Sequence, residues 1–476
     1  MAAAAALALA AACATNPATG RSQLSLVSEQ QEIGMGRQAD REIVSSIGLY
    51  EDERLQRYVA GLGARLAGES ERPGLPWTFR VVDDSAVNAF ALPGGFIYVT
   101  RGLMAHMRSE AQLAGVLGHE IGHVTGRHSV NQISKAQLTT LGLGIGMILR
   151  PELQDFGGLA EMGLSLLFLK YGRDHEREAD LLGVRYMTRE GYEPGELRDV
   201  FRTLERVGDA AGSRRLPGWL STHPSAEDRT EHIAAAISEL PPGRVGGRVE
   251  QDGYLRRLDG VEFGEDPREG YFEGNDFYHP EMRFRLEFPA GWTTANRKEA
   301  VGATSPGRDA VVVVTLSRQG APAAAAREFA SQQGVRLGTA QRGQAGGLAS
   351  LEYEFAAATG QGEVRGVAAF VEHGGRVFQI LGYTPAASWS RYDGVLRESV
   401  DSFRRLDDSR YLNVEPKRLD VVALPGRMSL REANERYPST EPLETVAILN
   451  QAEEGDHFPA GALFKRVVGG RRAGGR

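Results

Sequence analysis

Two histidines stand four residues apart, at His119 and His123, inside a segment whose apolar residues recur at helical spacing. The pattern runs from Glu110 to Arg127 and predicts a helix with one buried stripe. On a helix, residues four apart project from one face about one turn apart, so both imidazoles can bind a single metal ion. The chain must therefore fold so that this face of the helix meets further ligands.

Glu120 directly follows the first of these histidines. A zinc ion in a hydrolytic site takes three protein ligands and leaves a fourth position for water, whose pKa the metal lowers towards neutrality. Glu120 lies too far round the helix to be a comfortable ligand, so it is the candidate general base that takes a proton from this water. The chain has 10 histidines, and such a motif can arise by chance, so a third ligand is needed to support it.

The segment from Tyr171 to Asp180 offers the candidates for this third ligand. Glu176 and Asp180 are four residues apart and share a helix face, whereas Glu178 is turned about 200° from Glu176. Glu176 can therefore bind the metal while Asp180 accepts the second ring N–H of either metal-binding histidine. His175 is the rival ligand, but it has no partner on its own helix face and is expected to be exposed.

The chain has a single cysteine, Cys13, which excludes an internal disulfide framework and a thiolate metal cluster. Cys13 ends an alanine and leucine run over residues 2–12 that resembles a secretory signal followed by a lipobox. No basic residue precedes the run, and Ala10 stands where a lipobox usually has leucine, so a plain signal peptide with an incidental cysteine is the alternative. Both interpretations predict export, and a lipidated Cys13 would tether the protein to a membrane.

Composition limits the classes of protein that the chain can belong to. A net charge of -7 with no basic stripe argues against a nucleic-acid partner. Apolar residues make up 41% of the chain and charged residues 25%, as in soluble globular proteins. The longest apolar segment, residues 138–149, is shorter than the roughly 18 to 20 residues needed to span a bilayer. We expect it to be buried or to cover the active site, and a membrane-dipping loop is the alternative.

With 476 residues the chain should contain about three domains, and the patterns predict an α+β multidomain fold. Helical periodicity dominates the first half, where Ser28 with Gln31 forms a capping-box pattern and Asp52 precedes a second helix. Residues 79–82 and 96–99 are predicted strands, residues 88–95 break the pattern between them, and alternating strands dominate from Phe277 onwards. The expected parts are a signal peptide and lipobox (1–13), a mainly helical metallopeptidase domain (14–245), a linker (246–275), an α/β sandwich-like domain (276–405), and a small strand-helix-helix-strand module with a basic tail (406–476).

The motifs together resemble those of the HtpX and CAAX-prenyl-protease-like family of zinc metallopeptidases, over about residues 16 to 240. They are the His-Glu-x-x-His motif, the Glu-x-x-x-Asp pair of the later helix, and the preceding Asn-Ala-Phe-Ala-Leu-Pro-Gly-Gly segment, residues 88–95. The resemblance implies a gluzincin fold and one Zn²⁺ per chain. It implies as ligands His119, His123 and Glu176, with Glu120 as base and Asp180 behind the ligands.

The lipoprotein-like beginning is similar to that of the soluble, BepA-like and LoiP-like members of this family. That likeness implies an endopeptidase of the periplasm, anchored to the outer membrane, that acts on unfolded or misassembled envelope proteins. The BepA-like members carry tetratricopeptide repeats after the peptidase, and no 34-residue period is found here.

Thr222-His223-Pro224-Ser225 matches a further motif of the family, with Arg229 six residues beyond the histidine. His223 could stabilise the oxyanion of the reaction, or it could occupy the open metal position and hold the enzyme latent. The structural alternative is a histidine that packs locally at a helix start. Arg229 is a further candidate catalytic residue, and it could equally form a helix salt bridge. The other histidines considered, His106, His128 and His232, are interpreted as ordinary polar residues.

Two weaker resemblances concern the second half of the chain. Phe288-Pro289-Ala290-Gly291-Trp292 is similar to the opening of a PsbP-like sandwich. Residues 419–468 are similar in pattern to a LysM module, with Leu449-Asn450 and Pro459-Ala460-Gly461 at the characteristic steps. This likeness implies contact with peptidoglycan, and a purely structural cap is the alternative. An envelope scaffold that binds peptidoglycan and carries a latent peptidase is thus the competing hypothesis for the whole chain.

Overall fold

A computed structural model describes residues 13–143, 171–210, 218–223, 229–241, 243, 245–360 and 362–470. The expected signal segment before Cys13, the second half of the apolar segment 138–149 and the basic tail lie outside these residues. The chain divides into two compact units. The first unit contains the residues up to Glu265 together with Lys417–Gly469, and the second contains Asp266–Pro416.

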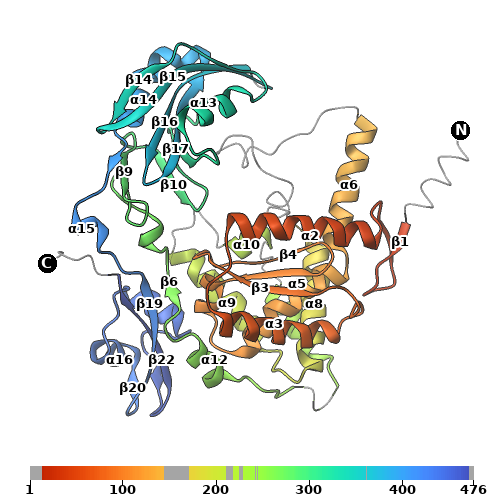
Figure 1. Ribbon diagram of the computed structural model, residues 1–476. Coiled ribbons are helices and arrows are strands. Elements are labelled where there is room, and N and C mark those ends of the chain that lie inside the picture. The colour runs from red at the N-terminus through yellow and green to blue at the C-terminus, as the bar shows by residue number, and fades with distance from the viewer. Residues whose placement is uncertain are drawn as a thin grey trace, which may run out of the picture. The chain divides into compact units, whose positions relative to one another are not determined.

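The first unit is mainly helical (Figure 1). Two helix starts follow the predicted capping: Ser28 and Gln31 form a capping box, and the Asp52 side chain accepts the backbone N–H groups of Arg54 and Leu55. The described helices before the second unit are α2 (Glu29–Ser46), α3 (Glu53–Gly68), α4 (Arg101–His106), α5 (Glu110–Thr125), α6 (His128–Leu143), α8 (Arg173–Arg189), α9 (Glu196–Ala210), α10 (Gly218–Thr222), α11 (Arg229–Ser238) and α12 (Gln251–Arg257). Within the described part of the chain, none of the helices is long and apolar enough to cross a membrane.

A three-stranded sheet packs against the helices of the first unit. β5 (Phe96–Thr100) lies between β3 (Thr78–Val82), which is parallel to it, and β4 (Ala89–Leu92), which is antiparallel. The sequence predicted β3 and β5 as strands and residues 88–95, which contain β4, as a break between them. β4 forms because its four apolar residues are all buried, and two glycines with positive φ make the turn to β5. A further pair, β1 (Cys13–Thr15) and β2 (Ser22–Leu24), is antiparallel.

Small residues bring α5 and α8 into close contact. A Cβ atom on Gly118 would lie 3.1 Å from the Cα atom of Gly183, and one on Gly122 would lie 3.0 Å from the Cα atom of Ala179. Real side chains rarely come this close, so the backbones can approach only because these positions lack bulk. The His-Glu-x-x-His helix is therefore held directly against the helix that carries Glu176 and Asp180.

The C-terminal segment folds onto the first unit rather than beside it. β19 (Lys417–Ala423) pairs with β22 (Leu463–Gly469) along its length and with β6 (Glu262–Phe263) at its beginning. Buried apolar side chains of this segment belong to the same core as those of α3 and α5; they are Leu419, Leu449, Leu463 and Val467. The remaining elements are β20 (Met428–Ser429), α16 (Leu430–Arg436), α17 (Leu443–Leu449) and β21 (His457–Phe458). The two longer strands and the two helices follow the expected order, with the short strands β20 and β21 in addition, and the LysM likeness itself stays a prediction.

The linker expected over residues 246–275 is not an open connection. Its first part forms α12 and β6, and Tyr254, Leu255, Leu258 and Val261 are buried in the main core. These apolar residues recur at helical spacing, but glycines and charged residues around them obscured the pattern.

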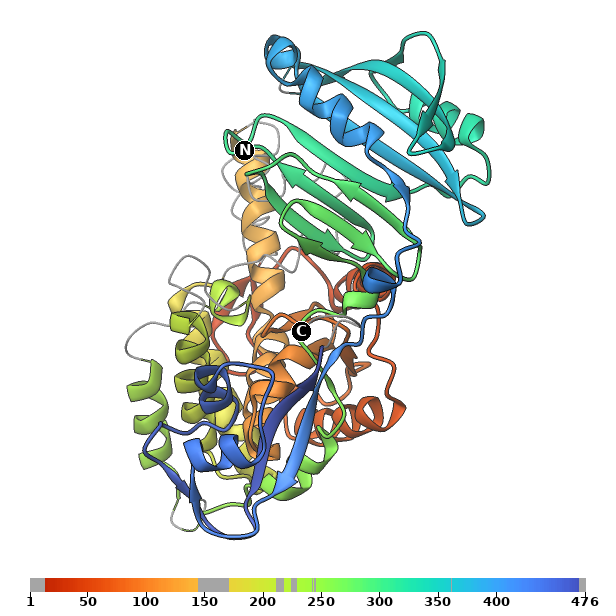
Figure 2. The ribbon, with the colours of Figure 1, turned by 90° about the vertical axis from the view of Figure 1, so that its left-hand side faces the viewer.

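The second unit contains an eight-stranded and a four-stranded antiparallel sheet. The larger has the order β10-β11-β12-β17-β16-β15-β13 with β14 paired to β15, and the smaller has the order β18-β9-β8-β7. Alternate residues of β16 face opposite sides: Val367 and Ala369 pack with α14 and the smaller sheet, whereas Ala368 and Phe370 pack with α13. Figure 2 shows α14, in blue, lying across the larger sheet.

The elements of the second unit have the following bounds. The strands are β7 (Tyr271–Glu273), β8 (Asp276–His279), β9 (Phe284–Glu287), β10 (Thr293–Arg297), β11 (Ala300–Thr304), β12 (Val311–Leu316), β13 (Val335–Leu337), β14 (Gln341–Ala345), β15 (Leu348–Thr359), β16 (Gly362–His373), β17 (Arg376–Pro385) and β18 (Arg404–Arg405). The helices are α13 (Pro322–Ala330), α14 (Trp389–Asp401), α15 (Ser409–Leu412) and the 3-10 turns η2 (Pro267–Glu269) and η3 (Ala386–Ser388).

Candidate metal centre

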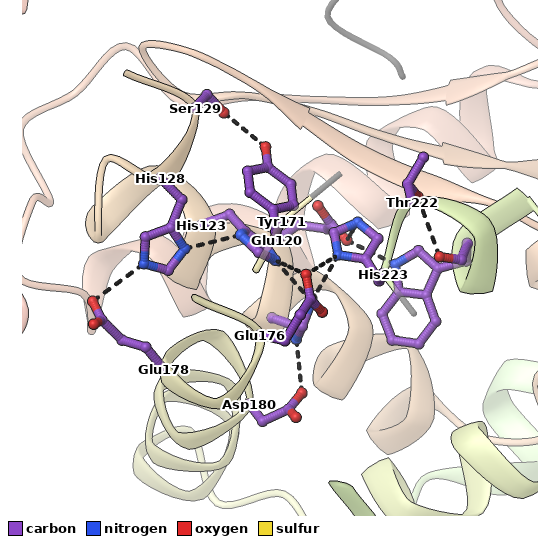
Figure 3. Close-up of polar contacts among 12 residues, drawn as sticks. Glu120, His123, His128, Ser129, Tyr171, Glu176, Glu178, Asp180, Thr222 and His223 are labelled. Atoms are coloured by element: carbon purple, nitrogen blue, oxygen red, sulfur yellow. Dashed lines mark hydrogen bonds and ion pairs between the residues drawn. The ribbon is translucent and has the colours of Figure 1, made fainter. Parts of the chain in front are cut away.

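Four buried side chains converge in the first unit with their donor atoms within 4.8 Å of one another (Figure 3). His119 and His123 project from α5, Glu176 from the first turn of α8, and His223 stands directly after α10. The Nε2 atoms of His119 and His123 are 3.0 Å apart, and each lies 3.6 Å from a carboxylate oxygen of Glu176. His223 Nδ1 is 3.0 Å from Glu176 Oε1 and 3.3 Å from His119 Nε2.

This donor set fits a single zinc-sized cation. Ligand atoms about 2.1 Å from zinc at tetrahedral angles are roughly 3.4 Å apart, close to the separations seen here. Imidazole and carboxylate are donors that zinc accepts, and no cysteine is needed. His119 Nδ1 lies 2.9 Å from Asp180 Oδ1, and an ionised carboxylate only accepts, so the His119 proton stands on Nδ1 and leaves the Nε2 lone pair free for a metal.

Asp180 is itself held by a buried arginine. Arg229 on α11 donates from Nε to Asp180 Oδ2 at 2.8 Å and from its second amino group to Oδ1 at 2.6 Å. Burial raises the pKa of Asp180, but the charge of Arg229 and the hydrogen bond from His119 outweigh it and lower the pKa below its usual value. Of the two partners considered for Asp180, the structure brings His119 to it. A bidentate guanidinium–carboxylate contact of this kind fixes the orientation of the carboxylate and stabilises its negative charge.

Glu176 has its charge compensated on two sides. Arg229 Nη1 lies 3.1 Å from Glu176 Oε2, and the guanidinium carbon lies 4.3 Å above the Phe201 ring. Burial raises the pKa of Glu176, but the charge of His223 and then that of His119 outweigh it, so the pKa is lowered. Glu176 is therefore ionised and able to bind a cation at neutral pH.

Glu120 is fully buried and is held by an indole. Trp219 on α10 donates its Nε1–H to Glu120 Oε1 at 2.8 Å. The other oxygen, Oε2, has no hydrogen-bond partner among the residues that the structure describes. One oxygen is thus fixed while the other is left to exchange a proton.

His223 has a strongly acidic surrounding. Its Nε2 lies 3.6 Å from Glu120 Oε1, and its backbone oxygen accepts a hydrogen bond from Arg229 at 3.3 Å. Burial lowers the pKa of His223, but the charges of Glu176 and then Glu120 outweigh it and raise the pKa. The rest of the predicted motif, Pro224-Ser225, lies outside the described residues.

Sequence reasoning missed several neighbours of His123. His128, interpreted there as an ordinary polar residue, lies with its Nδ1 2.9 Å from His123 Nδ1. Tyr171 stacks on the His123 ring at 4.0 Å and shares a hydrogen bond with Ser129. His175, expected to be exposed, is half-buried and stacks on His128 at 4.3 Å. Only the spacing of five residues after His123 could have pointed to His128, and a continuous helix would have turned it away.

Three other residues that the sequence analysis considered lie elsewhere in the described residues. Cys13 begins β1, where its Cα partner is Leu24. His106 is buried at the end of α4 and is not among the four donors, and His232 is exposed on α11.

Comparison with known proteins gives a family match over residues 53–237, with the family described as peptidase family M48. The beta-barrel assembly-enhancing protease of Escherichia coli (strain K12) is 31% identical over 252 residues, which are 51% of this chain and 51% of that protein. The mitochondrial metalloendopeptidase OMA1 of Arabidopsis thaliana is 36% identical over 190 residues, 38% of this chain and 37% of that protein. The chain thus spans about half or less of the length of these relatives.

Among solved structures, cyanobacterial PsbP (CyanoP) from Synechocystis sp. PCC 6803 matches 27% of this chain and 91% of that protein, with 17% identity and a TM-score of 0.24. A similarity this low supports no inference about fold or function.

Proposed function

We propose that this chain, in which residues 53–237 form a peptidase family M48 domain, is an exported zinc-dependent metalloendopeptidase. The observation that carries the proposal is the cluster of His119, His123 and Glu176, with Glu120 on the same helix as the two histidines. The two relatives, one named a protease and the other a metalloendopeptidase, support peptide-bond hydrolysis as the class of reaction. Because less than two thirds of each relative is matched, the activity is proposed here for this chain in its own right.

The three residues would hold one zinc ion, with Asp180 and Arg229 fixing the geometry behind them. Zinc, when bound, supplies Lewis-acid activation of a water molecule and of the peptide carbonyl. Asp180 keeps the His119 proton on Nδ1, and Arg229 pairs with both Asp180 and Glu176, so the ligand atoms remain free to bind the metal.

Glu120 is the proposed general base. Its Oε2 atom takes the proton of the attacking water and passes it to the amine of the leaving peptide, while Trp219 holds Oε1 in place. The site is buried, so the carboxylate exchanges its proton with the reacting groups rather than with bulk water.

His223 is proposed to hold the enzyme latent. Its Nδ1 atom lies among the metal donors, within 3.3 Å of both His119 Nε2 and Glu176 Oε1, which is the position that a substrate carbonyl or water would need. An oxyanion role would instead need His223 beside an open position. We therefore expect His223→Ala to raise basal activity; a folded, zinc-loaded variant that is no more active would contradict latency.

The substrates proposed are unfolded or misassembled proteins of the cell envelope, with Cys13 as a lipid anchor at the outer membrane. The name of the Escherichia coli relative, a beta-barrel assembly-enhancing protease, supports this setting. Metabolic labelling with a palmitate analogue tests the anchor: Cys13→Ser should remove the label.

The C-terminal segment is proposed as a peptidoglycan contact only on its LysM-like pattern. Binding of the full chain to purified sacculi tests this, and equal recovery with and without sacculi would contradict it. The competing hypothesis of a scaffold with a latent peptidase predicts sacculus binding without turnover, even after His223→Ala.

The decisive experiment for the peptidase is Glu120→Gln, which keeps the side-chain shape and the acceptor for Trp219 but removes the base. Casein cleavage should fall by roughly 10² to 10⁴, and bound zinc should stay near one per chain. The matched control is Glu231→Gln, at an exposed position of α11. Unchanged cleavage by zinc-loaded Glu120→Gln would contradict the mechanism, and absence of zinc from the parent chain would contradict the metal site.

A further inference from the structure

Three polar side chains, His128, Glu178 and Asn16, connect His123 to the N-terminal strands. Figure 3 shows the first two of them beside His123. His128 Nδ1 lies 2.9 Å from His123 Nδ1, and His128 Nε2 lies 3.3 Å from Glu178 Oε1. The same oxygen of Glu178 accepts a hydrogen bond of 2.7 Å from the Asn16 side-chain amide. His128 is fully buried and Asn16 is only 5% exposed, so these contacts are shielded from water.

The order of protons along these three side chains follows from the donors and acceptors. If His123 binds the metal through Nε2, its proton stands on Nδ1, and His128 must accept it at its own Nδ1. The ring proton of His128 then stands on Nε2, which lies 3.3 Å from Glu178 Oε1, an ion-pair distance to a carboxylate that only accepts. The Asn16 amide donates to that carboxylate from the other side. The Glu178 carboxylate thus favours the His128 tautomer with its proton on Nε2, and that tautomer accepts the His123 proton.

The backbone between His123 and His128 is shaped for this contact. Arg127 has φ 55°, a left-handed conformation that is uncommon outside glycine, and it returns the chain so that α6 begins at His128 beside α5. The Arg127 guanidinium donates to Glu32 at 3.0 Å and to the Val27 oxygen at 2.8 Å, which holds the turn.

Gly126 leaves the space that the contact needs. A Cβ atom at this position would lie 2.4 Å from His128 Nε2 and 2.8 Å from Glu178 Oε1. Gly126 has φ -70°, which any residue can adopt, so glycine is required here by the two side chains and not by the backbone.

Asn16 joins the N-terminal strands to the same place. Its side-chain oxygen accepts the backbone N–H of Ala18 at 2.9 Å and closes the turn between β1 and β2. In β2, the Gln23 amide donates to the Gly126 oxygen at 3.2 Å. The strand pair is therefore hydrogen-bonded both to Glu178 and to the turn that presents His128.

We propose that His128, Glu178 and Asn16 are positioning residues for His123, and that through Asn16 the β1–β2 strand pair governs how tightly the site holds its metal. The proposal rests on the zinc site proposed above. His119 has a carboxylate directly behind it, whereas His123 reaches its carboxylate through a second imidazole. The His123 side is thus the one that depends on a distant part of the chain.

The test measures metal retention in the full chain rather than turnover alone. Zinc release to a chromogenic chelator should be about 10 to 100 times faster in His128→Phe, which fills the ring space but accepts no proton from His123. Gly126→Ala should act in the same direction because its methyl group displaces both partners of the His128 contact. Asn16→Ala should give a smaller increase, and His128→Gln should restore part of the retention through its amide oxygen.

Cobalt substitution separates positioning of His123 from a general effect on stability, because the cobalt absorption spectrum responds to the orientation of the metal ligands. The visible absorption bands of the cobalt-loaded protein should shift in His128→Phe and Gly126→Ala, since the orientation of His123 sets the ligand field. Exposed controls are His457→Phe and Gly61→Ala, and a methyl group at Gly61 would meet no atom within 4 Å.

The outcomes separate this proposal from the zinc site on which it rests. A parent chain that binds no zinc overturns both. The second outcome is a parent that binds zinc while Gly126→Ala and Asn16→Ala release it at the parent rate, with unshifted cobalt spectra. This outcome overturns only the positioning role of His128, Glu178 and Asn16. Faster release with an unchanged unfolding temperature of the metal-free protein supports it, and this holds even if His128→Phe fails to fold, because the two milder variants decide.

Discussion

Trp219 donates its indole N–H to Glu120 Oε1 across 2.8 Å, with both side chains fully buried. The bond joins the middle of α5 to α10, the short helix that leads into His223. The Trp219 ring also meets the His119 ring edge-on at 5.2 Å. One side chain therefore touches the proposed base and a proposed ligand, and its helix positions the proposed latency residue.

Replacing Trp219 by phenylalanine should weaken catalysis without emptying the site. Trp219→Phe keeps an aromatic ring for the core but leaves Glu120 free to rotate, and we expect kcat to fall by about tenfold, less than in Glu120→Gln. KM and zinc content should stay near the parent values, because neither depends on the lost hydrogen bond. Trp389→Phe in the second unit is the matched control, and an unchanged kcat would contradict the role of Trp219 as holder of the base.

The spacing between α5 and α8 should control the metal site. Gly122→Val would force bulk against Ala179, whose Cα atom would lie 3.0 Å from even the first added carbon. Overpacking of this kind costs about 1 to 3 kcal/mol of unfolding free energy and would move Glu176 away from the histidines. We expect a lower unfolding temperature together with weaker zinc binding, measured by calorimetry and chelator competition. Parent-like zinc affinity in a folded Gly122→Val would show that the helices need not touch.

Some residues of the candidate metal centre could be predicted from the sequence and others could not. His119, His123, Glu176 and Asp180 could be found because helix spacing translates directly into shared faces. His128 could not be found in this way, because its approach to His123 depends on the left-handed conformation of Arg127. No local sequence pattern indicates that conformation. Trp219 and Tyr171 are apolar-core residue types, and only tertiary packing brings them to the metal side chains.

The fold shows the same division between local and non-local information. Helix caps such as Ser28 and Asp52 could be predicted because a capping interaction involves residues at most three positions apart in the sequence. The return of residues 417–469 onto the first unit could not be predicted, because it depends on pairing between strands far apart in the chain. The sequence pattern describes that segment equally well as a detachable module.

Acid should destabilise the first unit through His106. Burial, with a smaller contribution from the charge of Lys465, lowers the pKa of His106 to about 4 from an ordinary value of 6.5, while its bond to the Gly102 oxygen opposes the shift. Between those pH values the unfolded chain binds a proton that the folded chain does not, so stability falls as pH drops, by about 1.4 kcal/mol per unit.

The measurement for His106 is denaturant unfolding at pH 7 and pH 4.5. His106→Gln should lose less stability between these two conditions than the parent, because the amide takes up no proton in this range. The exposed His457→Gln should behave as the parent does. Equal acid sensitivity of parent and His106→Gln would mean that His106 already titrates normally in the folded protein.

The C-terminal segment should be indispensable to the first unit, whereas the second unit should be removable. The four core residues of this segment, Leu419, Leu449, Leu463 and Val467, are almost fully buried. At about 1.5 to 3 kcal/mol each they amount to roughly 6 to 12 kcal/mol, as much as the whole stability of a typical domain. Buried Lys465 adds hydrogen bonds of 2.8 and 2.7 Å to the Ala105 and Met107 oxygens.

A pair of deletions tests this difference in one assay. A chain that stops at Pro416 should lose the cooperative unfolding transition of the first unit and its zinc, because the core of that unit is left open. A chain in which a short glycine-rich loop replaces residues 266–416 should keep both, since Phe263 of β6 and Lys417 of β19 are already paired across the insertion point. Circular dichroism and zinc content read out both deletions. A folded, zinc-loaded chain ending at Pro416 would show instead that the C-terminal segment is a detachable module, as a separate glycan-binding domain would be.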